Sequence, residues 1–197
     1  MNSVLARITV VSGRVSGNGE PHSGRRTKEQ MTHAREERFQ RLLGDHKGIL
    51  YKICNSYCRD RDDRDDLAQE IALHLWRSFD AFDDRYRFST WMYRIALNVA
   101  ISFYRRERTR TRHVTSDEAY LLEAIDDTES QPEEIRMLYQ LIEALDPMNK
   151  ALVLLYLDGH SHQEIADVLG ITTTNVATKI GRLKVAMKRQ LSRTEQG

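Results

Sequence analysis

The sequence has few of the residues that interrupt helices, with only 3 prolines among 197 residues. Because proline removes a backbone donor and kinks a helix, this scarcity favours helices over the turn-rich chain of a β-sandwich or barrel. No apolar run approaches the roughly 20 residues that cross a bilayer, and no apolar segment with a cleavage site opens the chain. We therefore expect an all-α, cytoplasmic protein without membrane insertion.

Cysteine is equally scarce, since Cys54 and Cys58 are the only two. They lie four residues apart in a helical pattern, without a second pair at zinc-ligand spacing. We expect both to be core residues, with a zinc or redox role as the alternative. The sequence also lacks a phosphate-binding glycine loop, a nucleophile beside a general base and a metal-ligand set. We predict no enzyme activity, no cofactor and no small-molecule substrate.

Charges of the two signs nearly cancel, with 30 basic and 29 acidic residues, but they occur in blocks. Arginines crowd residues 105–112, and an acidic tract follows over residues 117–134. Like-charge repulsion extends such a tract, so it is typical of a flexible acidic linker between two small helical domains. The expected divisions are a disordered extension (1–33), a first domain (34–112), a linker (113–131), a second domain (132–192) and a tail (193–197).

Apolar residues at three- and four-residue intervals predict three helices in the first domain. The first stripe runs from Phe39 to Tyr57, and the second covers residues 63–80. The third helix follows a charged loop, and Ser89 is its expected N-cap. It ends in the arginine-rich stretch, which would attract nucleic-acid phosphates.

The second domain carries stronger helix-end signals. Asp146-Pro147 ends one helix and begins the next, and Gly159 closes that one. Ser161 and Glu164 have the spacing of a capping box. Gly170 follows, where a turn between helices often requires positive φ. The order of short helix, tight turn and long helix over residues 161–183 predicts a helix-turn-helix, whose last helix continues to about residue 191.

The last helix would present polar groups to duplex DNA. Hydroxyl, amide and cationic side chains bond base edges and phosphates. The alternative is that its basic residues are only a solvated helix face. The expected outward residues are Thr173, Thr174, Asn175, Thr178, Lys179 and Arg182.

Two regions of the sequence, one in each expected domain, together resemble a known protein family. Residues 65–70 (DDLAQE), followed by residues 88–100 (FSTWMYRIALNVA), resemble the first conserved domain of extracytoplasmic-function (ECF) sigma factors of the sigma-70 family. Residues 145–188 resemble the second. The resemblance covers most of residues 35–190 and implies a factor that binds core RNA polymerase and promoter DNA. It also implies a partner anti-sigma factor.

The resemblance assigns roles to particular residues. It implies a polymerase-binding surface, which would meet arginines of a facing coiled coil; the alternative is acidic residues that favour a helix N-terminus. It also implies that the first domain recognises and melts the minus-ten element, with Asn98 reading an extruded base. The alternative for Asn98 is a plain surface amide. The polymerase set is Asp65, Asp66, Gln69 and Glu70; the minus-ten set is Tyr86, Arg87, Phe88, Arg94, Asn98, Arg105 and Arg106.

Two other functions remain open from the sequence. One is an autonomous helix-turn-helix regulator, which would bind duplex DNA without polymerase. The other is a protein-binding adaptor, for which Lys179 and Arg182 would be dispensable. Thr173, Thr174 and Asn175 stand where many ECF relatives have smaller or more basic residues, so the resemblance does not supply the promoter sequence.

Overall fold

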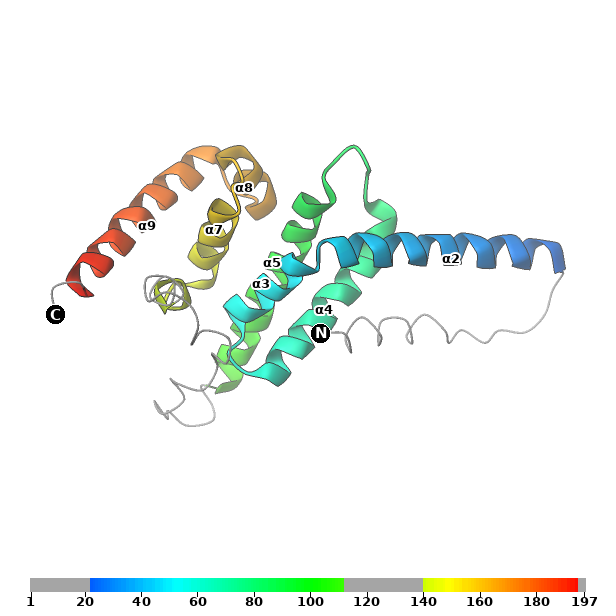
Figure 1. The fold of residues 1–197 in the computed structure, drawn as a ribbon, viewed down its shortest axis with the longest axis horizontal. Coiled ribbons are helices and arrows are strands. Elements are labelled where there is room, and N and C mark those ends of the chain that lie inside the picture. Colours follow the sequence, from blue (N-terminus) through cyan, green and yellow to red (C-terminus); the bar gives the residue numbers. More distant parts are fainter. Residues whose placement is uncertain (1–21, 112–139, 195–197) are drawn as a thin grey trace.

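The computed structural model describes residues 22–111 and 140–194, and within these ranges every regular element is helical (Figure 1). None of the helices there is both long and apolar enough to cross a membrane. The predicted all-α class is confirmed, while the predicted linker lies outside the described residues. The elements are α2 (His22–Asp45), α3 (Lys47–Tyr57), α4 (Arg61–Ser78), η1 (Phe79–Ala81), α5 (Phe88–Thr111), α7 (Pro147–Leu157), α8 (His162–Leu169) and α9 (Thr173–Thr194).

The first domain consists of α2 to α5. Helices α3, α4 and α5 pack against one another, and α2 lies across them and continues past the bundle (Figure 1). Asp60 caps α4 by accepting from the backbone N–H groups of Asp62 and Asp63. The shared core is aliphatic at its centre, where the most deeply buried side chains include Ile53, Leu67, Ile71, Leu75 and Met92.

The N-terminal part of α2 corrects part of the predicted disorder of residues 1–33. The helix begins at His22, so residues 22–33 are helical, while residues 1–21 lie outside the described residues. After Pro21 the sequence has no further proline until Pro132, and Lys28, Glu29, Gln30 and Met31 all have high helix propensity. This composition favours the extension of α2 towards the N-terminus.

The first predicted helix is two helices in the structure. His46 interrupts it with φ −111° and ψ 14°, and its Nδ1 lies 2.8 Å from the carbonyl oxygen of Leu42. The apolar periodicity continues through the break, because Leu43 and Leu50 both stay buried. The expected stripe was therefore right, but the break depends on a local side-chain contact that periodicity does not reveal.

The third helix begins at Phe88, two residues earlier than a cap at Ser89 would allow. The N–H of Trp91 donates to the carbonyl of Arg87 at 3.2 Å, so Ser89 lies in the first turn and does not cap it. Phe88, the first helical residue, is packed among aromatic rings. Burial of this ring explains the earlier start, since it fixes the first turn from the inside.

The second domain has the helix ends that the sequence predicted. Asp146 caps α7 with Pro147 at its start, and Ser161 with Glu164 forms a full capping box on α8. Gly170 ends α8 at φ +67°, a conformation that costs a residue with a Cβ more than it costs glycine. The capping box and the turn at Gly170 define how α8 leads into α9. Together the two helices form the helix-turn-helix.

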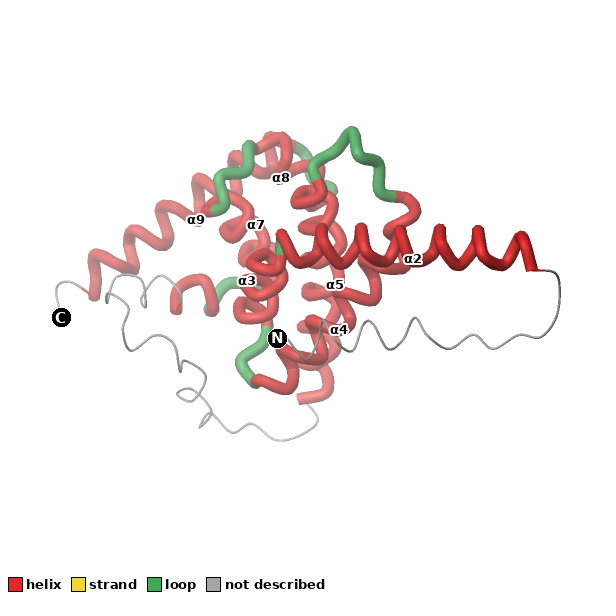
Figure 2. Tube along the Cα trace, turned by 45° about the vertical axis from the view of Figure 1, so that its right-hand side comes forward, coloured by secondary structure: helices red, strands yellow, loops and turns green. Residues whose placement is uncertain are grey.

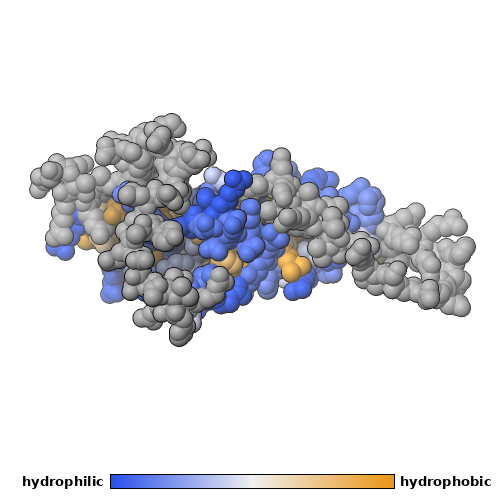
Figure 3. All heavy atoms as spheres, turned by 90° about the horizontal axis from the view of Figure 1, so that it is seen from below, coloured by the Kyte–Doolittle hydropathy of each residue, from blue (hydrophilic) through white to orange (hydrophobic). Residues whose placement is uncertain are grey.

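The two domains lie side by side. Helices α7 and α8 pack against α5, and both views place them next to α3 and α5 (Figures 1 and 2). Buried apolar residues of the two domains form one continuous cluster. On the face drawn in Figure 3, the described surface is mostly hydrophilic and its apolar patches are small.

Candidate nucleic-acid interface

The acidic face of α4, defined as Asp65, Asp66, Gln69 and Glu70, lies on the outside of the first domain. Asp65 and Gln69 are four residues apart, as are Asp66 and Glu70, so the two pairs form two adjacent rows along the helix. The opposite side of the helix is buried through Leu67 and neighbouring apolar residues. The structure thus brings the four predicted polymerase-binding residues together on one surface.

One apolar residue on this surface was missed by the sequence reasoning. Leu73 is 36% exposed and lies four residues after Gln69, so it extends the same row. A large apolar side chain at this position would add apolar area to a partner's binding surface. Its helical spacing from Gln69 was the signal that could have found it.

Glu70 and Arg106 link two surfaces that the sequence assigned to different partners. The Nη2 of Arg106 donates to Oε2 of Glu70 at 2.6 Å, across from α5 to α4. The hydrogen bond to Glu70 raises the pKa of Arg106. Both side chains remain partly exposed, so the pair contributes little to stability. In this structure Arg106 is therefore paired with a residue of the predicted polymerase-binding set.

An exposed polar face runs along α5. Arg94 and Asn98 lie one turn apart on it, and Arg105 continues the same direction nearer the C-terminal end. Ser102, which the sequence reasoning missed, lies between them and donates its hydroxyl to the Asn98 carbonyl at 2.8 Å. The α5 polar face is hereafter Arg94, Asn98, Ser102 and Arg105.

The loop before α5 holds an aromatic ring in solvent. Tyr86 is 68% exposed, and its backbone N–H donates to the Asp83 carbonyl at 3.0 Å. Asp83 also accepts from Arg85, and these hydrogen bonds lower the pKa of the Asp83 carboxyl group. The closed turn presents Tyr86 and the exposed Arg87 beside the start of α5.

Phe88 does not lie on this surface. It is only 6% exposed, and its ring lies 5.3 Å from those of Phe82 and Trp91. Edge-to-face and tilted contacts of this kind stabilise a core. The predicted DNA contact through Phe88 is corrected to a role inside the protein, where the ring supports the loop that carries Tyr86.

Helix α9 presents its predicted DNA-facing residues on the outside, while Val176, Ile180 and Leu183 are buried against α7 and α8. Thr173 donates to Oε1 of Gln163 at 3.0 Å, which ties the start of α9 to α8. Lys179 is half-buried. The others are exposed, namely Thr173, Thr174, Asn175, Thr178 and Arg182.

Lys184 behaves differently from the other basic residues of α9. Its Nζ donates to the Tyr156 hydroxyl at 2.5 Å and lies 4.3 Å from that ring's centroid. It therefore stabilises the packing of α9 on α7. Arg182, by contrast, remains on the exposed side of α9.

The two cysteines are free and buried, as the sequence predicted for core residues. Burial raises the pKa of both thiols to about 12. A thiolate is the reactive and metal-binding form, so neither cysteine is activated in this environment. Within the described residues, no group of three potential metal-ligating side chains occurs.

Comparisons with known proteins match both domains. The model of Sigma-70 region 2 matches residues 42–110, and that of Sigma-70, region 4 matches residues 135–187. The first match contains the acidic face of α4 and the α5 polar face. The second contains the whole helix-turn-helix down to Met187.

Curated relatives share most of the chain. The RNA polymerase sigma factor HrpL of Pseudomonas syringae pv. syringae is 30% identical over 160 residues, covering 78% of this chain and 86% of that protein. The ECF RNA polymerase sigma factor SigW of Bacillus subtilis is 27% identical over 175 residues, covering 83% of this chain and 94% of SigW.

Solved structures show the same fold. CnrH in complex with the cytosolic domain of CnrY has a TM-score of 0.57 at 25% identity, covering 79% of this chain and 88% of that one. The sigma factor RpoE of Bartonella quintana, in complex with the anti-sigma factor NepR, has a TM-score of 0.63 at 19% identity, covering 79% and 98%. The chain belongs to the sigma-70 family as an ECF sigma factor, which binds core RNA polymerase and directs promoter-specific transcription initiation.

Proposed function

We propose that the first domain binds polymerase through the acidic face of α4 and holds the melted minus-ten strand against α5. The observation that carries this proposal is the exposure of Arg94 and Asn98 one turn apart, beside a loop that presents Tyr86 to solvent. The same small domain thus offers a cationic group, a base-reading amide and a stacking ring without any rearrangement of its core.

Each of these groups suits an unpaired strand. The Asn98 amide has both donors and acceptors for the edge of an extruded base, and the Tyr86 ring offers a face on which a base can stack. Arg87, Arg94 and Arg105 would neutralise phosphates, with affinity that falls as salt rises. Arg106 would join them once it leaves Glu70.

The second domain would read the minus-thirty-five duplex. In a helix-turn-helix, the first turns of the second helix enter the major groove. Thr173, Thr174 and Asn175 occupy those turns here, and Thr178 and Arg182 follow one and two turns later on the exposed side. Hydroxyl and amide groups would contact base edges, while Lys179 and Arg182 would contact phosphates.

The proposed mechanism needs no covalent step from this chain. Binding energy from polymerase and from the upstream duplex would be used to keep the minus-ten strands apart, and the polymerase would carry out all bond chemistry. We accordingly assign the chain no enzymatic activity, cofactor or small-molecule substrate, and a cytoplasmic location, where polymerase acts. The proposed domains are residues 22–112 and 132–192, with 113–131 as the linker and 193–197 as the tail.

An anti-sigma partner belongs to the same proposal. The two similar structures are complexes, one of CnrH with CnrY and one of RpoE with the anti-sigma factor NepR. By analogy, a protein that covers the acidic face of α4 and Leu73 would keep this factor from polymerase. The competition is measurable, since such a partner and core polymerase would exclude each other.

The decisive experiment separates strand capture from polymerase binding. We expect Asn98→Ala to abolish open-complex formation, measured as permanganate reactivity of minus-ten thymines, while association with core polymerase is unchanged. Asn55→Ala is the matched control, because it removes an exposed amide from α3 of the same domain. Normal melting by Asn98→Ala would remove the assignment.

A band-shift assay distinguishes the sigma function from the two alternatives, an autonomous helix-turn-helix regulator and a protein-binding adaptor. An autonomous regulator would shift a promoter duplex equally well with and without core polymerase. A protein-binding adaptor would tolerate the double substitution Lys179→Ala and Arg182→Ala. We expect polymerase-dependent shifts that this double substitution weakens.

A further inference from the structure

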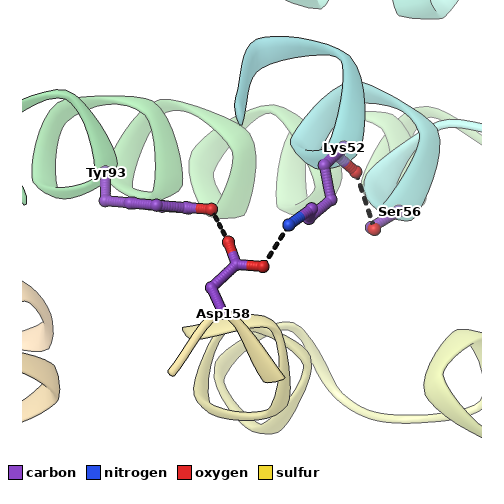
Figure 4. Close-up of polar contacts among 4 residues, drawn as sticks. All are labelled: Lys52, Ser56, Tyr93 and Asp158. Carbon is purple, nitrogen blue, oxygen red and sulfur yellow. Dashed lines mark hydrogen bonds and ion pairs between the residues drawn. The ribbon is translucent and has the colours of Figure 1, made fainter. Parts of the chain in front are cut away.

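The ring of Tyr86 and the amide of Asn98 belong to segments that are held in different ways. Asn98 belongs to α5, which is fixed along its buried side. Tyr93 of that helix is buried and donates its hydroxyl to Asp158 of α7 (Figure 4). Tyr86 lies in the loop over residues 82–87, which is not part of any helix. Because both groups would hold the same strand, their spacing depends on what holds this loop.

Aromatic rings fix the two ends of the loop. The rings of Phe82 and Phe88 meet edge-to-face with their centroids 5.3 Å apart. The ring of His46, at the break between α2 and α3, lies 5.2 Å from that of Phe88. Between these ends, the N–H of Tyr86 donates to the Asp83 carbonyl at 3.0 Å. That bond sets the shape of the turn, but it does not connect the turn to any helix.

Helix α2 contacts the middle of the loop through an arginine. The Nη2 of Arg38 donates to Oδ1 of Asp84, which is 46 positions later in the chain. The guanidinium carbon of Arg38 also lies 5.4 Å from the centroid of the Phe79 ring in η1, within the range of a cation–π contact. Asp84 is two residues before Tyr86, so this ion pair connects the turn that carries the exposed ring to α2.

Arg35, one turn earlier, fixes α2 against the end of α4, which α2 crosses (Figure 1). Its Nη2 donates to the Trp76 carbonyl at 3.1 Å, and its guanidinium carbon lies 4.0 Å from the centroid of the Trp76 ring. Its Nε lies 2.6 Å from Oδ1 of Asp80 as an ion pair, although this N–H is not aligned for a hydrogen bond. Since α2 is continuous through both arginines, Arg35 determines where Arg38 lies.

The two arginines of α2 also complete a pattern of charge pairing. Three carboxylates lie in η1 and the loop, and each forms an ion pair with an arginine. The pairs are Asp80 with Arg35, Asp83 with Arg85, and Asp84 with Arg38. An unpaired carboxylate in the loop would repel the phosphates of a strand that lies against Tyr86. Helix α2 thus supplies two of the three cations that compensate these charges.

We propose that Arg38 is a positioning residue for strand capture, which acts through Asp84 to hold the loop so that Tyr86 is presented beside α5. Arg38 does not contact DNA itself. This inference rests on the proposed function, because Tyr86 has this role only if the first domain holds an unpaired strand. A loop that is ordered before binding loses less conformational freedom when the strand arrives, so the strand binds more tightly.

The expected size of the effect follows from the exposure of the pair. The side chains of Arg38 and Asp84 are 40% and 72% exposed, and an exposed ion pair contributes little. Loss of the pair should therefore weaken strand binding by about two- to fivefold. Loss of the stacking ring itself would be a larger effect, because the ring contacts the base.

Strand binding by the holoenzyme tests the proposal in the intact complex. The probe is the fluorescein-labelled non-template strand of a promoter that this factor transcribes in vitro, and fluorescence anisotropy measures its dissociation constant. Arg38→Ala should raise that constant about two- to fivefold, and Arg38→Lys should restore much of the binding. Arg41→Ala removes an exposed arginine from the same helix and should leave binding unchanged. If Arg38→Ala binds the strand as the parent does, the proposal is overturned.

An Asp84→Ala background separates positioning from direct contact with DNA. If Arg38 acts through Asp84, adding Arg38→Ala in that background should change the dissociation constant by less than about 1.5-fold, because the two losses are then not additive. An equal factor in both backgrounds would mean that Arg38 itself holds a phosphate, which would overturn the proposal. Urea midpoints of Arg38→Ala and Arg41→Ala should agree; a clearly lower midpoint for Arg38→Ala would overturn positioning in favour of a general loss of stability.

Hydrogen exchange in the free full-length chain tests the loop without DNA or polymerase. The N–H of Tyr86 reports on closure of the turn, since it donates to the Asp83 carbonyl. It should exchange about two- to fivefold faster in Arg38→Ala than in the parent, and at the parent's rate in Arg41→Ala. Equal rates in all three proteins would overturn the proposal. If the parent holoenzyme does not bind the strand at all, the proposed function fails, and the exchange rates alone then decide whether α2 holds the loop.

Discussion

The two domains differ in how they hold the residues proposed to contact DNA. The second domain carries these residues along a single helix, α9, whose buried side is aliphatic. The first domain combines a loop with a helix, and a cluster of aromatic rings around Phe88 supports their junction. In the proposed function, the helix of the second domain would enter a duplex groove, and the loop and helix of the first would hold an unpaired strand.

The largest expected effect is a loss of polymerase association caused by changes in the first domain. Reversing Asp65 and Asp66 to lysine should abolish association with core polymerase, because both charges would oppose a basic partner surface. The helical fold of both domains should persist. Sedimentation with core polymerase and circular dichroism measure the two properties. A matched double reversal at Asp45 and Asp167, both exposed, should leave core association intact; if it does not, net charge alone explains the loss.

The next prediction compares Phe88, whose buried ring supports the loop before α5, with Tyr86, whose ring is exposed on that loop. Phe88→Ala removes a buried ring and should lower the free energy of unfolding by about 3–5 kcal/mol. Tyr86→Ala changes an exposed residue and should alter stability by less than about 0.5 kcal/mol, yet weaken binding of a minus-ten single strand by about 1–3 kcal/mol. Urea unfolding measures the changes in stability, and fluorescence anisotropy measures the binding of the single strand. Equal stability losses in the two variants would contradict the assigned positions.

A smaller effect tests the local signals of the second domain. Ser161→Ala removes the hydroxyl that accepts from the Glu164 backbone at 3.2 Å and should cost about 1 kcal/mol of stability. Ser161→Asp is the rescue variant, since aspartate is an equally good N-cap. Thermal unfolding by circular dichroism reports both. No difference between alanine and aspartate would show that the capping box is dispensable.

The smallest effect is a pH dependence of the same capping box. Hydrogen bonds from the backbone and side chain of Ser161 lower the pKa of Glu164 below its ordinary value of 4.5. The ionised carboxylate therefore contributes stability above that value, and the contribution is lost as pH falls through the lowered pKa. Melting temperatures from pH 6 to pH 3 should fall more for the parent than for Glu164→Gln. Parallel curves would contradict this.

The parts of the structure that depend on neighbours along the chain could be predicted from the sequence. The caps at Asp146 and Ser161, the turn at Gly170 and the exposed side of α9 all follow from short spacings, and the structure confirms them. The acidic face of α4 follows equally from residues four apart.

Long-range packing explains what the sequence left out. The family resemblance placed Phe88 in the minus-ten set, yet rings from the end of η1 and from α5 enclose it. The ring of His160, in the loop between α7 and α8, packs on Tyr93, which is 67 positions earlier in the chain. Neither contact has a local pattern. The junction between the domains was therefore the least predictable part of the fold.

The most direct test of the whole account is in vitro transcription with purified core polymerase on a genomic fragment library. Discrete transcripts should appear only when this chain is added, and they should disappear with Asn98→Ala while the variant still sediments with the polymerase. If the chain neither associates with core polymerase nor changes the transcripts, the assignment of its two domains to polymerase and promoter DNA is contradicted.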